Sequence, residues 1–146
     1  MKSGAKIKRI QLKDNQISNS ALIGIVSTEP DYKLSLALNH KLKISLKNDS
    51  PVLIIEASGV EMAFSRFSDT SAAPDISYTL TSNRAGKNSL LKKLKNIDFI
   101  FQIHNPGNED AVRTTSSKLK EMECITAVFR IDPVSVKDKN IQYIIQ

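Results

Sequence analysis

Three side chains of this chain could act as a general base or a nucleophile: His40, His104 and Cys124. Such groups need a partner that tunes their pKa, so their spacing matters. His104 and Asp98 share one face of a predicted strand, but six residues of strand separate them by roughly 20 Å. His40 lies among polar helix residues, and Cys124 opens a strand, where a buried structural thiol is typical. We therefore expect no catalytic residue, and a small enzyme around His104 or Cys124 is the least favoured reading.

The sequence also lacks residue sets that hold metals or phosphates. A metal site needs three or four ligands, and two separated histidines with a single cysteine supply no identifiable set. The segment Gly86-Lys87-Asn88-Ser89 resembles the end of a phosphate-binding loop, but it has no upstream glycine. We expect no metal and no cofactor.

Positive charge is the strongest functional signal, and it is unevenly placed. The net charge is +6, with 15 Lys and Arg against 8 Asp and Glu in residues 1–95, and 6 against 7 in residues 96–146. One group of five cations contains no acid: Arg84, Lys87, Lys92, Lys93 and Lys95. A second group lies near the start: Lys2, Lys6, Lys8, Arg9 and Lys13. Together they could bind a polyanion such as RNA, weakly and without sequence preference because no exposed aromatics interleave. A solvated face is the plainer explanation, and we favour it modestly.

Composition indicates an ordinary soluble domain. Of 146 residues, 40% are apolar and 25% are charged, which is typical of one globular domain. We expect residues 1–6 to form a flexible tail and residues 7–146 a single domain. One cysteine excludes an internal disulfide, and no apolar run is long enough for a membrane span or a secretory signal. A cytoplasmic protein without membrane contact is therefore expected.

Hydrophobic periodicity predicts the elements that would position these residues. Strands are predicted at 7–12, 21–27, 52–56, 60–65, 76–81, 97–103, 125–131 and 141–145, and helices at 28–42 and 108–122. Residues 82–87 are predicted to form an exposed loop. Thr28 should cap the first helix, with Pro30 in its first turn, and Asn108 should cap the second. Strands 60–65 and 76–81 should form an antiparallel hairpin, while the helix between strands 97–103 and 125–131 would allow these two to run parallel.

These elements predict an α+β two-layer sandwich, with a mixed, mostly antiparallel sheet and helices on one face. Ile97, Phe99, Phe101 and Ile103 should point into its core. In the strand 125–131, Phe129 should share the core side with Ile125 and lie opposite to Val128. The opposite face should be more polar, yet it would carry Ile100 and Val128. A further segment or a partner subunit must then cover these two residues, which makes them a candidate partner surface.

Two segments resemble the IPExxxVDY family of uncharacterised bacterial proteins. Residues 91–99 read LKKLKNIDF, in which Asp98 matches the family's name motif and Ile97 and Phe99 are conservative replacements, while its Pro and Glu are missing. Residues 22–39, LIGIVSTEPDYKLSLALN, look like the family's strand running into an Asp-Tyr-x-Leu helix. The resemblance implies bacterial origin but no activity. Taken together, we expect a non-enzymatic binding or adapter module with a protein partner or as a homodimer, and the alternative is a weak RNA binder.

Overall fold

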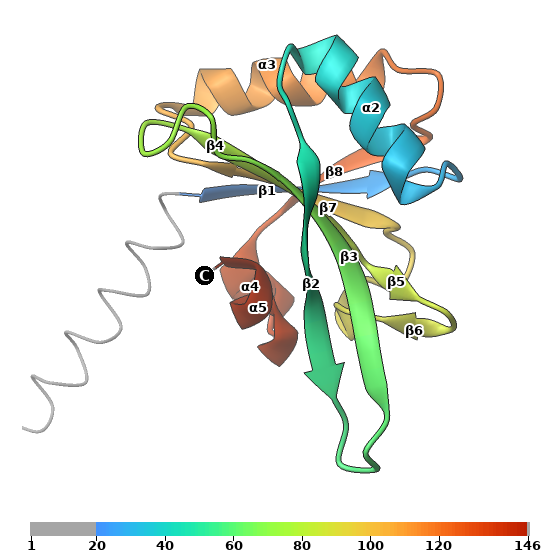
Figure 1. The fold of residues 1–146 in the computed structure, drawn as a ribbon. Coiled ribbons are helices and arrows are strands. Elements are labelled where there is room, and N and C mark those ends of the chain that lie inside the picture. Colours follow the sequence, from blue (N-terminus) through green and yellow to red (C-terminus); the bar gives the residue numbers. More distant parts are fainter. Residues whose placement is uncertain (1–19, 146) are drawn as a thin grey trace, which may run out of the picture.

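A computed structural model describes residues 20–145 and shows a six-stranded sheet at the centre (Figure 1). The strand order is β2-β3-β4-β7-β1-β8, and every neighbouring pair is antiparallel. The strands are β1 (Ser20–Val26), β2 (Lys47–Ile55), β3 (Glu61–Asp69), β4 (Ser77–Ser82), β7 (Phe99–His104) and β8 (Ala127–Ile131). A separate hairpin joins β5 (Arg84–Ala85) to β6 (Asn88–Ser89). The predicted strand at 7–12, the tail and the first basic group lie outside the described residues.

Two long helices cover one face of the sheet, α2 (Asp31–Leu42) and α3 (Glu109–Lys120) (Figure 1). Leu34 and Leu38 of α2 and Leu119 of α3 are fully buried against β1 and β7. Apolar spacing of three to four residues places such side chains on one side of a helix, as the sequence predicts. The α+β class with long helices on one face is confirmed.

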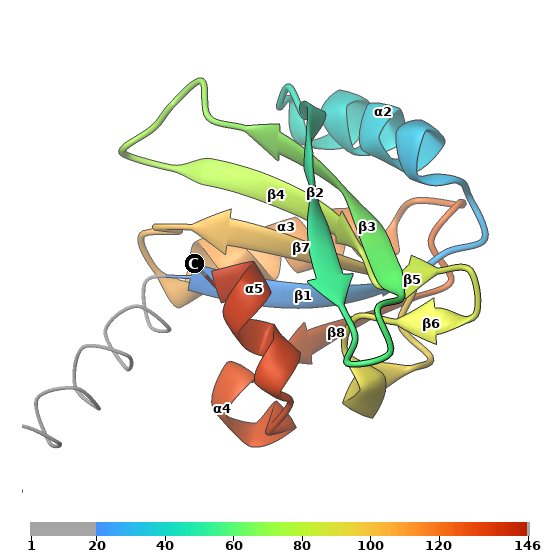
Figure 2. The same cartoon turned by 60° about the horizontal axis from the view of Figure 1, so that its bottom comes forward.

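Short C-terminal helices cover the opposite face (Figure 2): α4 (Pro133–Val136), η2 (Lys139–Ile141) and α5 (Gln142–Ile145). Ile144 of α5 packs in a cluster with Leu22, Phe64 and Ile100, together with Leu91 from the segment before β7. We call this cluster the second core. Of the two expected ways to cover Ile100, a further segment of the same chain is the one observed. The sheet is thus covered by short helices on its second face as well.

The C-terminal residues 141–145 are helical, so the prediction of a last strand is wrong. Ile141, Ile144 and Ile145 all pack on the second core, and their spacing of three to four residues suits a helix. A short apolar run does not distinguish a strand from a buried helical turn. Packing against the sheet decides the conformation here.

The two long helices differ in how well their beginnings were predicted. Asn108 caps α3 as expected, because its side chain accepts a hydrogen bond from Ala111 N at 2.8 Å. Helix α2 begins after Pro30 instead of at Thr28. Ser27 Oγ accepts from Glu29 N at 3.2 Å, and this local bond competes with an earlier helical turn.

Strands β7 and β8 run in the same direction, but β1 lies between them and is antiparallel to both. The prediction of a mixed sheet is therefore wrong in one respect, because every pairing in the six-stranded sheet is antiparallel. The β3–β4 hairpin is antiparallel as predicted.

Three residues face differently from the prediction. Ile97 precedes β7 and packs in the second core, whereas Phe99, Phe101 and Ile103 pack under the long helices. Val128 pairs with Ile25 and so shares the face of the long helices. Phe129 pairs with Gly24 on the other face and is 47% exposed. The irregular entry into β8 shifts the alternation by one after Ile125, which turns the following side chains of that strand to the other face, whereas in β7 only Ile97, ahead of the strand, departs from the prediction.

The two edges of the sheet are built differently. β2 is irregular, with a register shift between Asp49 and Val52, and it contains Pro51. β8, at the other edge, has no proline and pairs regularly with β1 over five residues. The β8 edge is the one with a continuous strand.

Truncation of the Ile144 side chain of α5, which packs in the second core, should destabilise the protein. Ile144 is 5% exposed, so Ile144→Ala should lower the free energy of unfolding by about 2–5 kcal/mol. Val134→Ala is the control, because Val134 of α4 is 58% exposed and its truncation should cost less than about 0.5 kcal/mol. Urea denaturation of both variants tests this, and equal midpoints would show that α5 contributes no core.

Candidate partner-binding groove

The segment before β7 is held in shape by one buried amide. Asn83 is 0% exposed, and its Nδ2 donates to Leu94 O and Ile97 O, both at 2.9 Å. Its Oδ1 accepts from Leu91 N at 2.7 Å. The amide thus satisfies three backbone groups that would otherwise be buried without partners. This arrangement presents the short 3-10 helix η1 (Lys92–Leu94) at the surface.

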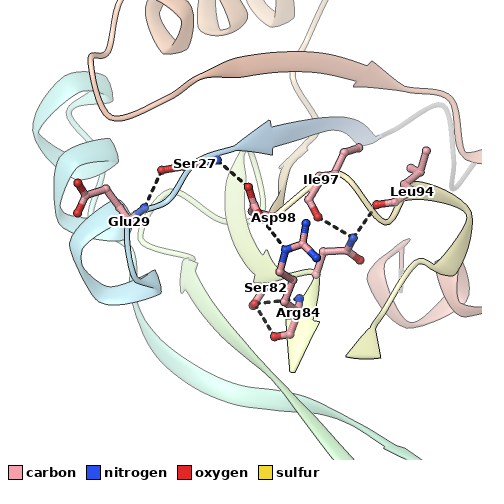
Figure 3. Close-up of polar contacts among 8 residues, drawn as sticks. Ser27, Glu29, Ser82, Arg84, Leu94, Ile97 and Asp98 are labelled. Atoms are coloured by element: carbon pink, nitrogen blue, oxygen red, sulfur yellow. Dashed lines mark hydrogen bonds and ion pairs between the residues drawn. The ribbon is translucent and has the colours of Figure 1, made fainter. Parts of the chain in front are cut away.

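Asp98 fixes the entry into β7 (Figure 3). Its Oδ2 accepts from Ser27 N at 2.9 Å, and its Oδ1 lies 2.5 Å from Arg84 Nε. Ser27 Oγ in turn donates to Cys124 O at 2.6 Å. The carboxylate therefore joins the ends of β1, β5 and β7. Arg84, one of the five predicted polyanion-binding residues, is thus paired with a carboxylate of the same chain, although its side chain is 46% exposed.

The other four cations of that group are exposed. Lys87 lies in the tight β5–β6 turn after Gly86, whose φ of +60° suits glycine at the first turn position. Lys92, Lys93 and Lys95 lie in and just after η1. Within residues 20–145 no carboxylate comes within 4.0 Å of any of these four amines. The structure therefore leaves them available to an outside anion.

An apolar groove of about 520 Å³ lies beside these lysines, between η1, β8 and α4. We call it the β8 groove, and its lining is Lys93, Leu94, Asn96, Ile97, Phe129, Arg130, Ile131, Asp132, Ser135 and Val136. Gly24 lies under it: a Cβ there would meet Ile97 Cδ1 at 2.5 Å and Ile131 Cδ1 at 3.3 Å. The glycine lets Ile97 pack directly on β1 and so shapes the floor of the groove.

The C-terminal segment closes the far side of this region. Asp138 Oδ2 accepts from Lys93 N at 3.1 Å, and Asn140 Nδ2 donates to Leu90 O at 2.8 Å. The backbone of the basic segment is thereby anchored while the Lys93 amine stays outside. A rigid backbone reduces the entropy lost when a partner binds.

The predicted partner surface is not formed by its two residues. Ile100 is fully buried in the second core, and Val128 lies on the opposite face of the sheet. The side chain that does emerge from this part of the sheet is Phe129. Sequence reasoning assigned Phe129 to the core, because a regular alternation from Ile125 onward predicts that it points inward.

His104 and Cys124, the two residues of the least favoured enzyme alternative, do not come together. His104 pairs with Ser20 at the start of β1, while Cys124 contacts Ser27 just beyond its end. Seven residues of strand put them roughly 20 Å apart. Burial raises the pKa of the Cys124 thiol, which opposes formation of the nucleophilic thiolate.

Among residues 20–145, no three side chains of His, Cys, Asp and Glu gather as a metal site. None of the helices in this part of the chain has the length and apolar character required to cross a membrane.

Asn83 was missed by sequence reasoning, which placed it in an exposed loop. A polar residue among Ser, Arg, Gly and Lys carries no signal of burial. Only the later segment 91–97, folded back onto it, supplies the groups that the amide binds. No local pattern could have identified it.

Removal of the Asn83 amide should destabilise the protein. Asn83→Ala leaves the buried Leu91 N–H and two carbonyls unpaired, so the free energy of unfolding should fall by at least about 1–3 kcal/mol. Asn88→Ala, at an exposed residue of β6, is the matched control and should stay within about 0.5 kcal/mol of wild type. Chemical denaturation measures both, and a silent Asn83→Ala would contradict the role assigned to the amide.

Acid should weaken the fold partly through His104. Burial lowers the pKa of this imidazole, so between about pH 6.5 and that lowered value the unfolded chain binds more protons than the folded one. The stability that the neutral ring retains above about pH 6.5 is lost as pH falls. His104→Gln should therefore flatten the decline in unfolding free energy between about pH 7 and pH 5.

His40→Gln, at an exposed histidine of α2, is the matched control for the substitution itself. Parallel urea titrations at several pH values measure the three proteins, and identical slopes in all of them would contradict the assignment to His104.

Comparison with known proteins was made through protein-family models and curated sequences, and neither gives a match to this chain. The resemblance to the IPExxxVDY family therefore stays a prediction. Function has to be inferred from the surface of the molecule.

Proposed function

We propose that this protein is a non-enzymatic binding module that takes up an extended, acidic and apolar segment of a partner protein along β8. The observation that carries the proposal is an edge strand directly beside an apolar groove that lysines border. The proposal includes a cytoplasmic location, which fits the single unpaired cysteine.

The edge strand offers main-chain affinity. β8 pairs with β1 alone among the strands of residues 20–145, so its other side presents unpaired backbone groups. An extended peptide can add to such an edge through main-chain hydrogen bonds. Side chains on alternate positions of that peptide would then reach the neighbouring groove.

The groove offers apolar selectivity. Phe129 is 47% exposed, and its aromatic ring borders a cavity that Leu94 and Val136 also line. Exposed aromatic side chains at a concave apolar site are typical anchors of protein interfaces. An apolar side chain of the partner would bury part of this surface.

The lysines give the expected charge of the partner. Lys93 lines the groove, and Lys92 and Lys95 are exposed beside it without a carboxylate within 4.0 Å in residues 20–145. Complementary charge favours a peptide that carries Asp or Glu. Arg130 already pairs with Glu109 and contributes less.

Weak nucleic-acid binding is the less favoured function. Asp98 engages Arg84, which reduces the five-cation group to four lysines. The remaining lysines border an apolar groove, whereas contacts to a phosphate backbone are made by charged and polar groups. A second copy of this chain is a further possible occupant, which the experiment below distinguishes.

A panel of linear peptides provides the test. Peptides that alternate apolar and acidic residues should bind, and Phe129→Ala should weaken their affinity by about tenfold, which corresponds to the loss of one interface anchor. Lys93→Gln should weaken only the acidic peptides and reduce the salt dependence of their binding. Leu36→Ala, at an exposed leucine of α2, is the matched control and should leave affinity unchanged. Fluorescence anisotropy measures all three variants.

Three outcomes would contradict this function. Binding of mixed RNA that weakens steeply with salt and is insensitive to Phe129→Ala would favour the nucleic-acid alternative. Self-association that sedimentation detects and Phe129→Ala abolishes would make a second copy the occupant. If no peptide binds Phe129→Ala with lower affinity than Leu36→Ala, the groove is not the binding site.

A further inference from the structure

A second concave site lies on the sheet at some distance along it from the β8 groove. It is a polar pocket of about 170 Å³, and its lining includes Arg66, Thr79, Thr81, Gln102 and His104. Asp49 of β2, the cross-strand partner of Arg66, also lines it and brings a carboxylate to its rim. The cross-strand register explains the cluster: Arg66 pairs with Thr81, Thr79 pairs with Gln102, and His104 follows two residues after Gln102. These side chains therefore stand next to one another on one face of β3, β4 and β7.

The polar character of this pocket is unusual for the face on which it lies. Ile100 and Phe64, on the same face, are fully buried in the second core. Thr81 and Gln102 are equally buried, at 1% exposure each. Burial of polar groups costs free energy unless they have hydrogen-bond partners. Gln102 Nε2 donates to Ser20 Oγ at 3.3 Å, so Gln102 already has a partner, and the polar lining around it matches a polar occupant in character.

Arg66 supplies the most specific observation. Its Nε atom is buried and has no hydrogen-bond acceptor within residues 20–145. Asp49 Oδ2 is 3.8 Å away, beyond hydrogen-bond distance, and that carboxylate already accepts from Ser68 Oγ at 2.9 Å and Ser50 N at 2.7 Å. A buried N–H donor without an acceptor is rare in proteins.

We propose that this pocket binds a small oxyanion, a phosphate or a short carboxylate, with Arg66 as its principal ligand. A guanidinium matches the planar geometry of such groups and can bind them through two parallel hydrogen bonds. Thr79 and Thr81 place hydroxyl groups next to it, and Tyr143 of α5 borders the opening with 37% exposure.

The volume restricts the class of ligand. A water molecule takes up about 30 Å³ in the liquid, so the pocket has the room of about five or six waters. That space accommodates a phosphate or a short carboxylic acid, whereas drug-sized ligands occupy at least about 300 Å³.

Titration with inorganic phosphate and with acetate, each at constant ionic strength with chloride, tests the proposal. Saturable binding is expected by calorimetry, and a difference between the two salts identifies the source of the oxyanion. Arg66→Gln should weaken binding by about tenfold or more. Asp49→Asn should strengthen it, because the variant removes a negative charge that faces Arg66. Arg113→Gln, at an arginine on exposed α3 surface, is the matched control.

The opposite signs expected for Arg66→Gln and Asp49→Asn separate ligand binding from a purely structural role. If Arg66→Gln fails to fold, the Arg66 Nε–H resonance of the wild-type protein gives an independent measurement, and it should shift as phosphate or acetate is added. No saturable binding of either salt, or equal affinity in Arg66→Gln and wild type, would overturn the proposal.

Discussion

The central strands β1 and β7 are buried on both faces, and this double burial is the constraint on which the rest of the structure depends. Leu22 and Ile23 are adjacent in sequence, point to opposite faces and are both 0% exposed. A sheet of this kind needs cover on each side. The long helices α2 and α3 supply one cover, and the short C-terminal helices and the segment before β7 supply the other.

That second cover has little regular structure, so side-chain hydrogen bonds hold it together. Asn83 and Asn140 each bind backbone groups of the segment 90–97 from different parts of the chain. Asp98 joins the same segment to the end of β1. Because polar groups fix its backbone, the segment can leave its lysines at the surface and its leucines in the core. The β8 groove lies between this segment, β8 and α4.

Regular periodicity made most of the fold predictable from sequence, and irregular strand entries limited it. The apolar spacing of Leu34 and Leu38 and the cap at Asn108 predict the two long helices correctly. The face of Phe129 and the helical state of Ile144 depend on tertiary packing that no local pattern encodes. In the candidate sites, the lysines could be predicted from the sequence because they form a cluster of charge. The pocket around Arg66 could not be predicted, because its residues come from strands that are separate in sequence.

The unequal edges of the sheet have a consequence for assembly. Pro51 lacks a backbone N–H, and the irregularity of β2 around it disrupts the regular hydrogen-bonding pattern that another strand would need. β8 has no such obstacle in the part of the chain that the structure describes. A molecule with two open edges can polymerise without limit through head-to-tail strand addition, whereas one with a single open edge can accept one strand and then stop. Among the described residues the sheet therefore has one regular edge, β8, and strand addition confined to that edge would end after a single added strand.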